Sequence, residues 1–554
     1  MMTATTVQFL LDDEIVSAAP MPPDRTVLQW LREDQARVGT KEGCAEGDCG
    51  ACTVVIAEPA VDGGLSYRAV NACIQFAPTL AGKALVTVES LSGAARQTGG
   101  SGAAEAPGGA SLANPVRLHP GMHPAMHPVQ QAMVDCHASQ CGFCTPGFVM
   151  SLFALYKTDP APARPSINDA LSGNLCRCTG YRPIIDAAFR MTRLACAGAA
   201  RADDATAVID DAGAAATAPA PASTHWLMSG AAARRSSDEI AEQAVADRLA
   251  GLTVAPCFTA ADGRRFHRPT RLAELARLRL EYPQALLLAG GTDIGLWVTK
   301  QYRPMGDILW LGAVPELARI ESSDHGMAIG AGVTLSAALP FLEALHPALG
   351  ALMRRFASVP VRNAATLVGN LANGSPIGDA APALMALGAT LTLRRGDEVR
   401  ELALEAFYLG YMKNALREGE FIERVTVPRP HPGVLFRSWK VTRRFDQDIS
   451  AVSAGLALEI EAGRVRSARL AFGGMDAIVR RATLAEQALV GASFGETAIE
   501  AAVAALATDF RPISDMRASA AYRMRVAGNL LRRLLADAGP DGVPTLYDMN
   551  QGVA

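Results

Sequence analysis

The spacing of apolar and polar residues separates the chain into four structured stretches and two that cannot build a core. In the structured stretches, apolar positions alternate or recur every three to four residues, which is typical of strands and helices. We expect four domains, over residues 1–91, 127–196, 256–430 and 431–554. Residues 92–126 and 197–255 are rich in small and polar residues, and we interpret both as linkers, the second with the pattern of an isolated helix at Asp238–Leu249.

The first domain mixes strands with a helix, whereas the second is helical. Val7–Ile15 predicts a hairpin around Asp12-Asp13, and Thr26–Arg37 has helical spacing behind Asp24 as a candidate cap. Strand patterns follow at Cys52–Ala57, Tyr67–Ala72 and Leu85–Glu89. Helical patterns in the second domain cover Pro128–His137, Pro146–Lys157 and Arg182–Leu194.

The third and fourth domains combine both kinds of element, so the expected fold class is α+β and multidomain. In the third domain, strands are expected at Leu286–Ala289, Ile308–Leu311 and Met327–Ile329, with helices at Arg271–Leu280 and Ala380–Leu387. After a proline-rich break at Pro428–Pro432, the fourth has strand patterns at Phe436–Lys440, Ala451–Ile460 and Ser467–Phe472 and a helix at Tyr522–Ala536.

Charge and hydropathy exclude several classes of partner. The 554 residues include 52 Lys and Arg against 55 Asp and Glu, which gives no bias toward nucleic acid or an anionic membrane. The N-terminal sequence has no signal-peptide pattern, and no apolar run reaches the roughly 18 residues that a membrane span needs. We therefore expect a cytoplasmic protein with no nucleic-acid or membrane partner.

Ten of the eleven cysteines lie in the first 200 residues, which favours metal ligation over disulfides in a long cytosolic chain. Cys44, Cys49 and Cys52 form C-x4-C-x2-C, and Cys73 follows, which is plant-type ferredoxin spacing for a [2Fe–2S] cluster. The glycines of this loop leave room for the backbone to wrap a cluster. A zinc site is the alternative, but zinc usually takes two short cysteine hooks.

A second set of four cysteines lies on the helical domain. Cys141 and Cys144 form C-x2-C, and Cys176 and Cys178 form C-x-C. The C-x-C hook is tight for tetrahedral zinc and acceptable where two thiolates bind one iron, so we favour a second iron–sulfur cluster over zinc. The three remaining cysteines have apolar neighbours and are assigned no role: Cys136, Cys196 and Cys257.

Glycine turns in the third domain are candidates for nucleotide binding. The segment LLLAGGTDIG is a strand leading into a turn whose amides can cradle a pyrophosphate, although most such turns are structural. RRFASVPVRNAATLVGNLANGSPIGDAAP adds a second Gly-Asn turn. The chain has neither a Rossmann G-x-G-x-x-G at a strand–helix turn nor a phosphate-binding G-x-x-x-x-G-K-[ST].

The histidines of HPGMHPAMHP recur every four residues, as if one helix face bound a metal. The proline after each of His119, His123 and His127 disfavours helical geometry, so we interpret the segment as a stiffened linker, with a metal site as the alternative.

Three of these motifs together, GCAEGDCGACTV, QCGFCTPG and LCRCTGYRPI, resemble the iron–sulfur region of the xanthine dehydrogenase family of molybdenum hydroxylases. The resemblance implies a ferredoxin-like β-grasp domain followed by a four-helix [2Fe–2S] domain whose cluster lies nearer to the molybdenum cofactor. Gln140 matches a glutamine that contacts molybdopterin across the subunit junction.

The second half of the chain resembles the flavin domain of the same family, which is of the vanillyl-alcohol-oxidase type, followed by a C-terminal α+β domain. The match carries FAD-binding roles to residues of both glycine segments and of SWKVTRRFDQDIS. The FAD residues so implied are Leu287, Ala289, Gly290, Gly291, Thr292, Asp293, Ile294, Phe356, Thr366, Gly369, Asn370, Asp379, Ile422 and Lys440. The loop Arg443–Asp448 resembles the segment that governs NAD access, but Phe445 stands where vertebrate members are more acidic.

The resemblance implies an electron-transfer subunit with no catalytic residue of its own. Electrons from xanthine or hypoxanthine hydroxylation at molybdenum, on a large molybdopterin-binding chain, would pass through the two clusters to FAD and then to NAD. Two small and two large chains are expected. The alternatives are the same subunit of an aldehyde or N-heterocycle hydroxylase and a stand-alone flavin and iron–sulfur electron carrier.

Overall fold

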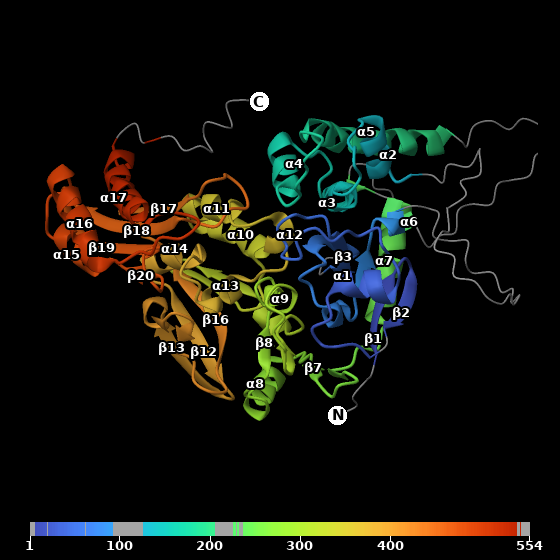
Figure 1. Cartoon of the computed structure of the whole chain (residues 1–554), viewed down its shortest axis with the longest axis horizontal. Helices are drawn as coiled ribbons and strands as arrows, with labels where there is room; N and C mark the ends of the chain where they lie inside the picture. The colour runs from blue at the N-terminus through green and yellow to red at the C-terminus, as the bar shows by residue number, and fades with distance from the viewer. Residues whose placement is uncertain are drawn as a thin grey trace, which may run out of the picture. The chain divides into compact units, whose positions relative to one another are not determined.

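The computed structural model describes residues 6–18, 20–60, 63–91, 126–204, 225–228, 230–231, 236–539 and 543. The chain forms two compact units, whose elements are labelled in Figure 1. The first unit contains Met1–Arg264 and Asp293–Arg303, and the second contains Arg265–Thr292 and Pro304–Ala554. Both combine helices and strands, so the α+β multidomain prediction is confirmed. No helix within the described ranges is long and apolar enough to cross a membrane.

The N-terminal part of the first unit is built on a five-stranded sheet of order β2-β1-β5-β3-β4. Its strands are β1 (Val7–Leu11), β2 (Glu14–Ala18), β3 (Thr53–Pro59), β4 (Leu65–Asn71) and β5 (Ala84–Val86). The predicted hairpin is confirmed: β1 and β2 pair antiparallel through Asp12 and Asp13, which both have positive φ. Strand β5 pairs parallel with β1 and antiparallel with β3.

The predicted helix at Thr26–Arg37 is shorter and differs in its cap. It consists of α1 (Val27–Gln29) and a π-helical turn at Trp30–Asp34. Thr26, and not Asp24, caps it: the Thr26 hydroxyl accepts from the Gln29 N–H at 3.1 Å, and the Gln29 side chain accepts from the Thr26 N–H at 3.1 Å. A hydroxyl at the cap with Gln three residues later is the capping-box pattern, and it satisfies two backbone donors at once.

Four helices form the next part of the first unit and gather together in Figure 1. They are α2 (Pro128–Asp135), α3 (Thr145–Thr158), α4 (Arg164–Leu171) and α5 (Arg182–Asp204). The three helical patterns of this domain are confirmed, and α4, which is short and has only Ile167 and Leu171 buried, had no distinct pattern of its own. Helix α5 continues into the predicted second linker, while the predicted linker residues 92–125 and 205–224 lie outside the described residues.

The predicted helix at Asp238–Leu249 is confirmed, but the expectation that it is isolated in a linker is wrong. Helix α7 (Ser236–Ala250) buries Val245, Ala246 and Leu249 in the same core as the sheet and the four helices. Helix α6 (His225–Met228) places Trp226 there as well. We call residues 225–228 and 236–250 the clasp, because they pack on both the sheet and the helices of the first unit.

A buried ion pair joins the clasp to helix α3. Lys157 of α3 and Glu242 of α7 meet at 2.8 Å, with side chains only 2% and 1% exposed. The Tyr67 hydroxyl of β4 donates to Glu242 at 2.8 Å, and Lys157 also donates to the Trp226 carbonyl at 2.6 Å. The Trp226 indole donates to Asp13 at 2.7 Å. Strand, helix and clasp are therefore joined through one polar network in which each charge has several partners.

His127 contacts the clasp as well, and both of its ring nitrogens have partners within the protein, so it is not free to bind a metal. It caps α2, since its Nδ1 accepts from the Val129 N–H at 3.2 Å, and its Nε2 lies 3.0 Å from the Leu227 carbonyl oxygen, to which the neutral ring donates. The other two histidines of the repeat, His119 and His123, lie outside the described residues.

We expect acid to destabilise the first unit through His127. Burial lowers the pKa of His127 to about 3, whereas an unfolded histidine titrates near 6.5. Between these values the unfolded chain binds a proton that the folded chain does not, so stability is lost as pH falls through this window, by about 1.4 kcal/mol per pH unit. Unfolding free energies measured from pH 7 to 4 check this. In His127→Gln, the slope of unfolding free energy against pH should decrease by the amount that corresponds to about one bound proton. His137→Asn is the control: His137 is exposed, and asparagine tolerates the positive φ at this position. This substitution should leave the slope unchanged.

The first part of the second unit contains two sheets. Strands β7 (Arg265–His267), β9 (Ile308–Trp310) and β8 (Leu286–Leu288) run parallel, with α8 (Leu272–Glu281) packed on β9. The other sheet has the order β10-β11-β16-β12-β13. Its strands are β10 (Ile320–Ser323), β11 (Gly326–Gly330), β16 (Phe421–Pro428), β12 (Thr390–Arg395) and β13 (Glu398–Ala403).

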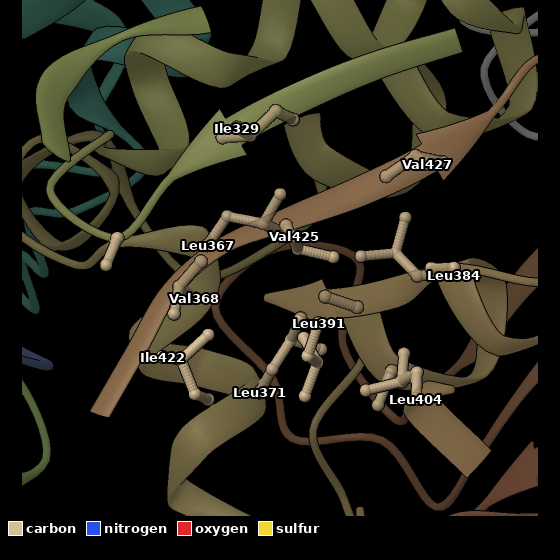
Figure 2. Packing of buried hydrophobic residues seen from close by; sticks show 14 of the residues in the cluster. Ile329, Leu367, Val368, Leu371, Leu384, Leu391, Leu404, Ile422, Val425 and Val427 are labelled. Atoms are coloured by element: carbon tan, nitrogen blue, oxygen red, sulfur yellow. The ribbon is translucent and has the colours of Figure 1, made fainter. Parts of the chain in front are cut away.

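Helices α10–α14 accompany this second sheet and share one apolar core with it. They are α10 (Leu335–Leu345), α11 (Pro347–Arg354), α12 (Val359–Arg362), α13 (Leu367–Asn373) and α14 (Ala380–Ala386). Figure 2 shows this core, in which Ile422 and Val425 of β16 lie near Val368 and Leu371 of α13.

The C-terminal part of the second unit packs helices against a four-stranded sheet of order β17-β18-β19-β20. The strands are β17 (Val434–Val441), β18 (Val452–Glu461), β19 (Arg464–Gly473) and β20 (Arg480–Arg481). The helices are α15 (Thr483–Leu489), α16 (Glu496–Asp509) and α17 (Ala520–Asp537). The three predicted strands and the final predicted helix of this domain are confirmed.

Candidate functional site

The first cysteine quartet lies at one end of the β3–β4 pair. Cys52 directly precedes β3 and Cys73 follows β4, and the antiparallel pairing brings them together, with the Ala72 N–H donating to the Cys52 carbonyl at 3.2 Å. Cys44 and Cys49 come from the preceding loop, where the Cys49 N–H donates to the Cys44 sulfur at 3.3 Å. The sequence-predicted ligands are thus adjacent.

The four thiols interact strongly enough to shift one another's pKa values. Cys49, and then Cys73, hydrogen-bond to the Cys44 sulfur and hold its pKa well below the ordinary value, while Cys73 lowers the pKa of Cys52. Cys49 and Cys73 have raised pKa values because they share their protons with these partners. Cys44 thus interacts with both Cys49 and Cys73, and Cys73 also interacts with Cys52, so the four thiols form one connected donor set, as a [2Fe–2S] cluster needs.

The second quartet surrounds the start of α3 and the loop before α5. Cys178 Sγ lies 3.8 Å from both Cys176 Sγ and Cys141 Sγ, and Cys144 hydrogen-bonds to Cys176. Burial, followed by the bond to Cys176, raises the pKa of Cys144 to about 12. Within the described residues, no three His, Cys, Asp or Glu side chains surround a single-ion position. The thiols form a chain of neighbours, which a two-iron cluster can bridge.

One member of this quartet is poised as a thiolate. Burial opposes ionisation of Cys176, but the Thr179 hydroxyl, at 3.0 Å, and the Thr179 N–H, at 3.4 Å, lower its pKa to about 7. The Tyr181 hydroxyl accepts from the Cys176 N–H at 2.9 Å. Gln140, beside Cys141, is exposed. Thr179 and Tyr181 orient the loop, and the sequence analysis did not single them out although both lie in the CRCTGY motif.

The two quartets are in direct contact through the backbone. The Leu175 N–H donates to the Cys49 carbonyl at 3.0 Å, so the residue before Cys176 is bonded to a predicted ligand of the other quartet. The Asn174 side chain donates to the Gly50 carbonyl at 3.0 Å. Gly50 has a φ of +68°, and a Cβ there would lie 2.1 Å from the Gly173 carbonyl oxygen. Only glycine allows this approach, which shortens the path between the two sites.

The first glycine segment forms a cradle at the end of β8. A Cβ at Gly290 would lie 1.9 Å from the Ala364 carbonyl oxygen, and Gly291 has a φ of +74° that strongly favours glycine. The Ala289 carbonyl accepts from the Trp310 indole at 3.2 Å. Leu287 is half-buried against the core of the second unit. Thr292 is the last residue of this segment of the second unit, and Asp293 and Ile294 belong to the first unit.

The second glycine segment lies beside the first. Thr366 caps α13 by accepting from the Gly369 N–H at 3.0 Å, and a Cβ at Gly369 would lie 3.9 Å from that of Ala289. Asn370 Oδ1 is buried without a hydrogen-bond partner in the part of the chain that is described. A glycine cradle next to an unpaired buried carbonyl is the donor and acceptor set that a dinucleotide such as FAD needs, so these residues fit that cofactor.

The two remaining polar candidates form a buried cluster. Lys440 of β17 pairs with Asp379 at the start of α14, and both are at most 7% exposed. Ser450, which was not predicted, bonds to Asp379 and lies 3.2 Å from Lys440 Nζ. The two apolar candidates differ: Phe356 is half-buried, whereas Ile422 is a core residue against α13. Asp379 neutralises Lys440, so this cluster can present oriented donors without a net charge.

Arg355 is a second residue that the sequence analysis missed. Its guanidinium donates to the Lys440 carbonyl at 2.9 Å and to the Thr442 hydroxyl at 3.0 Å, and lies 4.8 Å from the centre of the Phe445 ring. The loop predicted to govern access is thus held at its base by one arginine. The sequence Arg354-Arg355-Phe356 has two adjacent arginines, and nothing in it indicates that Arg355 is the one that contacts the loop.

Comparisons with known proteins agree with this arrangement in all four regions. Residues 11–76 match the 2Fe-2S iron-sulfur cluster binding domain, and 118–189 match the [2Fe-2S] binding domain. Residues 259–430 match the FAD binding domain in molybdopterin dehydrogenase, and 437–538 match the CO dehydrogenase flavoprotein C-terminal domain. The chain belongs to the molybdenum hydroxylase family.

Within the molybdenum hydroxylases, the chain is similar to two named xanthine dehydrogenases. It is 31% identical over 527 residues to xanthine dehydrogenase of Emericella nidulans, covering 91% of this chain and 36% of that protein. It is 30% identical over 546 residues to xanthine dehydrogenase/oxidase of Gallus gallus, covering 91% of this chain and 38% of that protein. The chain therefore spans little more than a third of the length of these relatives.

Among solved structures, a chain of the Cu,Mo-CO dehydrogenase in its cyanide-inactivated form is 28% identical, with a TM-score of 0.46 over 48% of this chain and 94% of that one. The family matches in all four regions confirm the resemblance inferred from the cysteine motifs at the level of the family. Two domains that match [2Fe–2S] models and one that matches an FAD-binding model share this chain.

Proposed function

We propose that this chain is the electron-transfer subunit of a xanthine dehydrogenase. It would receive electrons from hypoxanthine or xanthine hydroxylation on a molybdopterin-binding partner, in an assembly of two small and two large chains, and deliver them to NAD. The similarity to xanthine dehydrogenases over 91% of the chain supports this proposal. The clusters and FAD, when bound, supply the one-electron and hydride chemistry.

The residues of the chain position those groups. We propose that Cys44, Cys49, Cys52 and Cys73 hold the first cluster. The second cluster is assigned to Cys141, Cys144, Cys176 and Cys178, and exposed Gln140 is proposed to face the partner's molybdopterin. The FAD assignments of the sequence analysis are retained, with the glycine cradle for the pyrophosphate and the Lys440 cluster for the flavin ring. The four domain ranges given above are likewise retained, except that residues 225–228 and 236–250 are grouped with the first unit instead of with a linker.

The contact between the two quartets is the observation that carries the electron-transfer proposal. The Leu175–Cys49 hydrogen bond joins them, and residues 293–303, which continue from the glycine cradle, touch the first quartet's loop within the same unit. There the Thr299 hydroxyl donates to the Ala45 carbonyl at 2.6 Å, and Lys300 lies 3.5 Å from Glu46. Within the first unit, bonded contacts thus join the two proposed cluster sites to the segment that follows the glycine cradle in sequence.

Anaerobic titration of the purified chain with NADH tests this function. We expect NADH to reduce the flavin and then both clusters, followed by visible absorbance and EPR. Cys176→Ser should halve the iron content from four to two per chain and still permit flavin reduction, whereas Cys136→Ser should keep all four irons. A flavin that NADH does not reduce would contradict the NAD assignment, and full iron in Cys176→Ser would contradict the second ligand set.

Substrate choice needs the partner chain. The same subunit could serve an aldehyde or N-heterocycle hydroxylase, so the co-purified complex should be assayed with xanthine, aldehydes and quinoline. Turnover of aldehydes alone would exclude the xanthine assignment. A chain that holds FAD and four irons but binds no partner would favour a stand-alone electron carrier.

A further inference from the structure

Asn71 is a buried polar residue to which the assignments above give no role. It is the last residue of β4, pairs with Thr53 across the β3–β4 ladder and is 2% exposed. Neither its side-chain nitrogen nor its side-chain oxygen has a hydrogen-bond partner of normal geometry among the described residues. An unpaired buried amide costs about 1–3 kcal/mol, so a good hydrogen bond is expected to form here once the neighbouring site is occupied.

The first cysteine quartet is close to this amide. Cys52 precedes Thr53, the residue opposite Asn71 in the ladder, and Cys73 follows Asn71 by two positions. Asn71 Oδ1 is also 3.7 Å from the position of a Cβ at Gly47, in the loop between Cys44 and Cys49. The Asn71 side chain also interacts with the Cys52 thiol. The amide is thus close to a ligand sulfur of the first quartet.

We propose that Asn71 donates an N–H···S hydrogen bond to the [2Fe–2S] cluster at Cys44, Cys49, Cys52 and Cys73 and raises its reduction potential. This inference rests on the proposed ligand set. Reduction adds one negative charge to the cluster, and a nearby donor stabilises the reduced form more than the oxidised form. Because the carboxamide is neutral, it does so without adding a titrating group. Asn71 would thereby set how readily this cluster accepts an electron.

Asn71→Leu tests the proposal, because leucine has a similar size and no donor. At a fixed potential, the ratio of reduced to oxidised first cluster should fall about tenfold, which for a one-electron couple is about 59 mV in midpoint. Redox titration of the full chain, with the cluster followed by EPR, measures this shift. Asn71→Asp, which replaces the donor by a carboxylate, should lower the midpoint at least as far.

Thr87→Val is the matched control. Thr87 is equally buried in the same domain, but it bonds to Ser90. Its replacement should leave the midpoint unchanged. Unchanged midpoints in Asn71→Leu and Asn71→Asp at full iron content would overturn the proposal, as would an equal shift in Thr87→Val.

A measurement on the unmodified chain covers the case in which the variants lose iron. Pulsed EPR of the reduced protein, labelled with ¹⁵N in the asparagine side chain, should show a nitrogen coupling to the first cluster. Absence of that coupling would overturn the role of Asn71. Failure of the unmodified chain to hold four irons would instead contradict the ligand set, so the two proposals can fail separately.

Discussion

Glu242→Gln is expected to destabilise the first unit by about 3–5 kcal/mol. The substitution leaves the Lys157 ammonium buried without its counter-charge, and removing one member of a buried ion pair has a cost of this size. It also weakens the Tyr67 contact, which ties the clasp to β4. Urea unfolding followed by loss of cluster absorbance measures the change, because the clasp packs on both cluster-bearing parts of this unit.

Two control variants separate the ion pair from other effects. Glu33→Gln removes one member of a surface pair with Arg25, whose other partner, Asp34, remains, so the change should be below about 1 kcal/mol. The double substitution of Lys157→Met and Glu242→Leu replaces the pair by apolar side chains and should recover most of the loss. If Glu242→Gln is as stable as Glu33→Gln, the buried ion pair of the clasp contributes little to stability.

Gly290→Ala is expected to abolish stable FAD binding. The added methyl would lie 1.9 Å from the Ala364 carbonyl oxygen. The oxygen belongs to the backbone and the methyl is attached directly to Cα, so neither can turn aside as the end of a flexible side chain would. Displacing the cradle by even part of an ångström separates its amides from the pyrophosphate, and overpacking of this kind costs about 1–3 kcal/mol or more. We expect FAD affinity to fall at least tenfold while the iron content stays at four per chain.

Gly306→Ala serves as the matched control in the same unit. A Cβ at Gly306 meets no atom within 4 Å, and its backbone needs no positive φ, so FAD content should match that of the unmodified chain. Flavin absorbance and fluorescence after gel filtration measure retention of the cofactor. Equal FAD retention in the two variants would show that the cradle does not hold the pyrophosphate.

The variants affect different sites of the proposed electron-transfer subunit. Gly290→Ala acts on the flavin site, Cys176→Ser on the second cluster, and Asn71→Leu on the potential of the first. Only Glu242→Gln acts at a distance from all three, by loosening the clasp. Separate readouts of iron, FAD and midpoint therefore assign each defect to its own site.

The sequence by itself determined the cysteine sets, most regular elements and the family. Most ligands of both quartets come in close spacings, C-x4-C-x2-C, C-x2-C and C-x-C, and a short loop brings such residues together whatever the rest of the fold does. Cys73 is brought to Cys52 by the β3–β4 pairing. Long strands such as β17 (Val434–Val441) and β18 (Val452–Glu461) were equally visible, because their alternating or apolar pattern extends over many residues.

Tertiary structure alone decided which distant polar residues meet. Helix α7 buries only one narrow face of small and medium side chains, so its sequence resembles a linker and does not reveal that Glu242 lies against Lys157. Nothing local marks Ser450 as the partner of Asp379, or Asn71 as a buried amide without a hydrogen-bond partner of normal geometry among the described residues. Periodicity records which face of an element is buried, whereas the partner across that face depends on packing between segments tens to hundreds of residues apart.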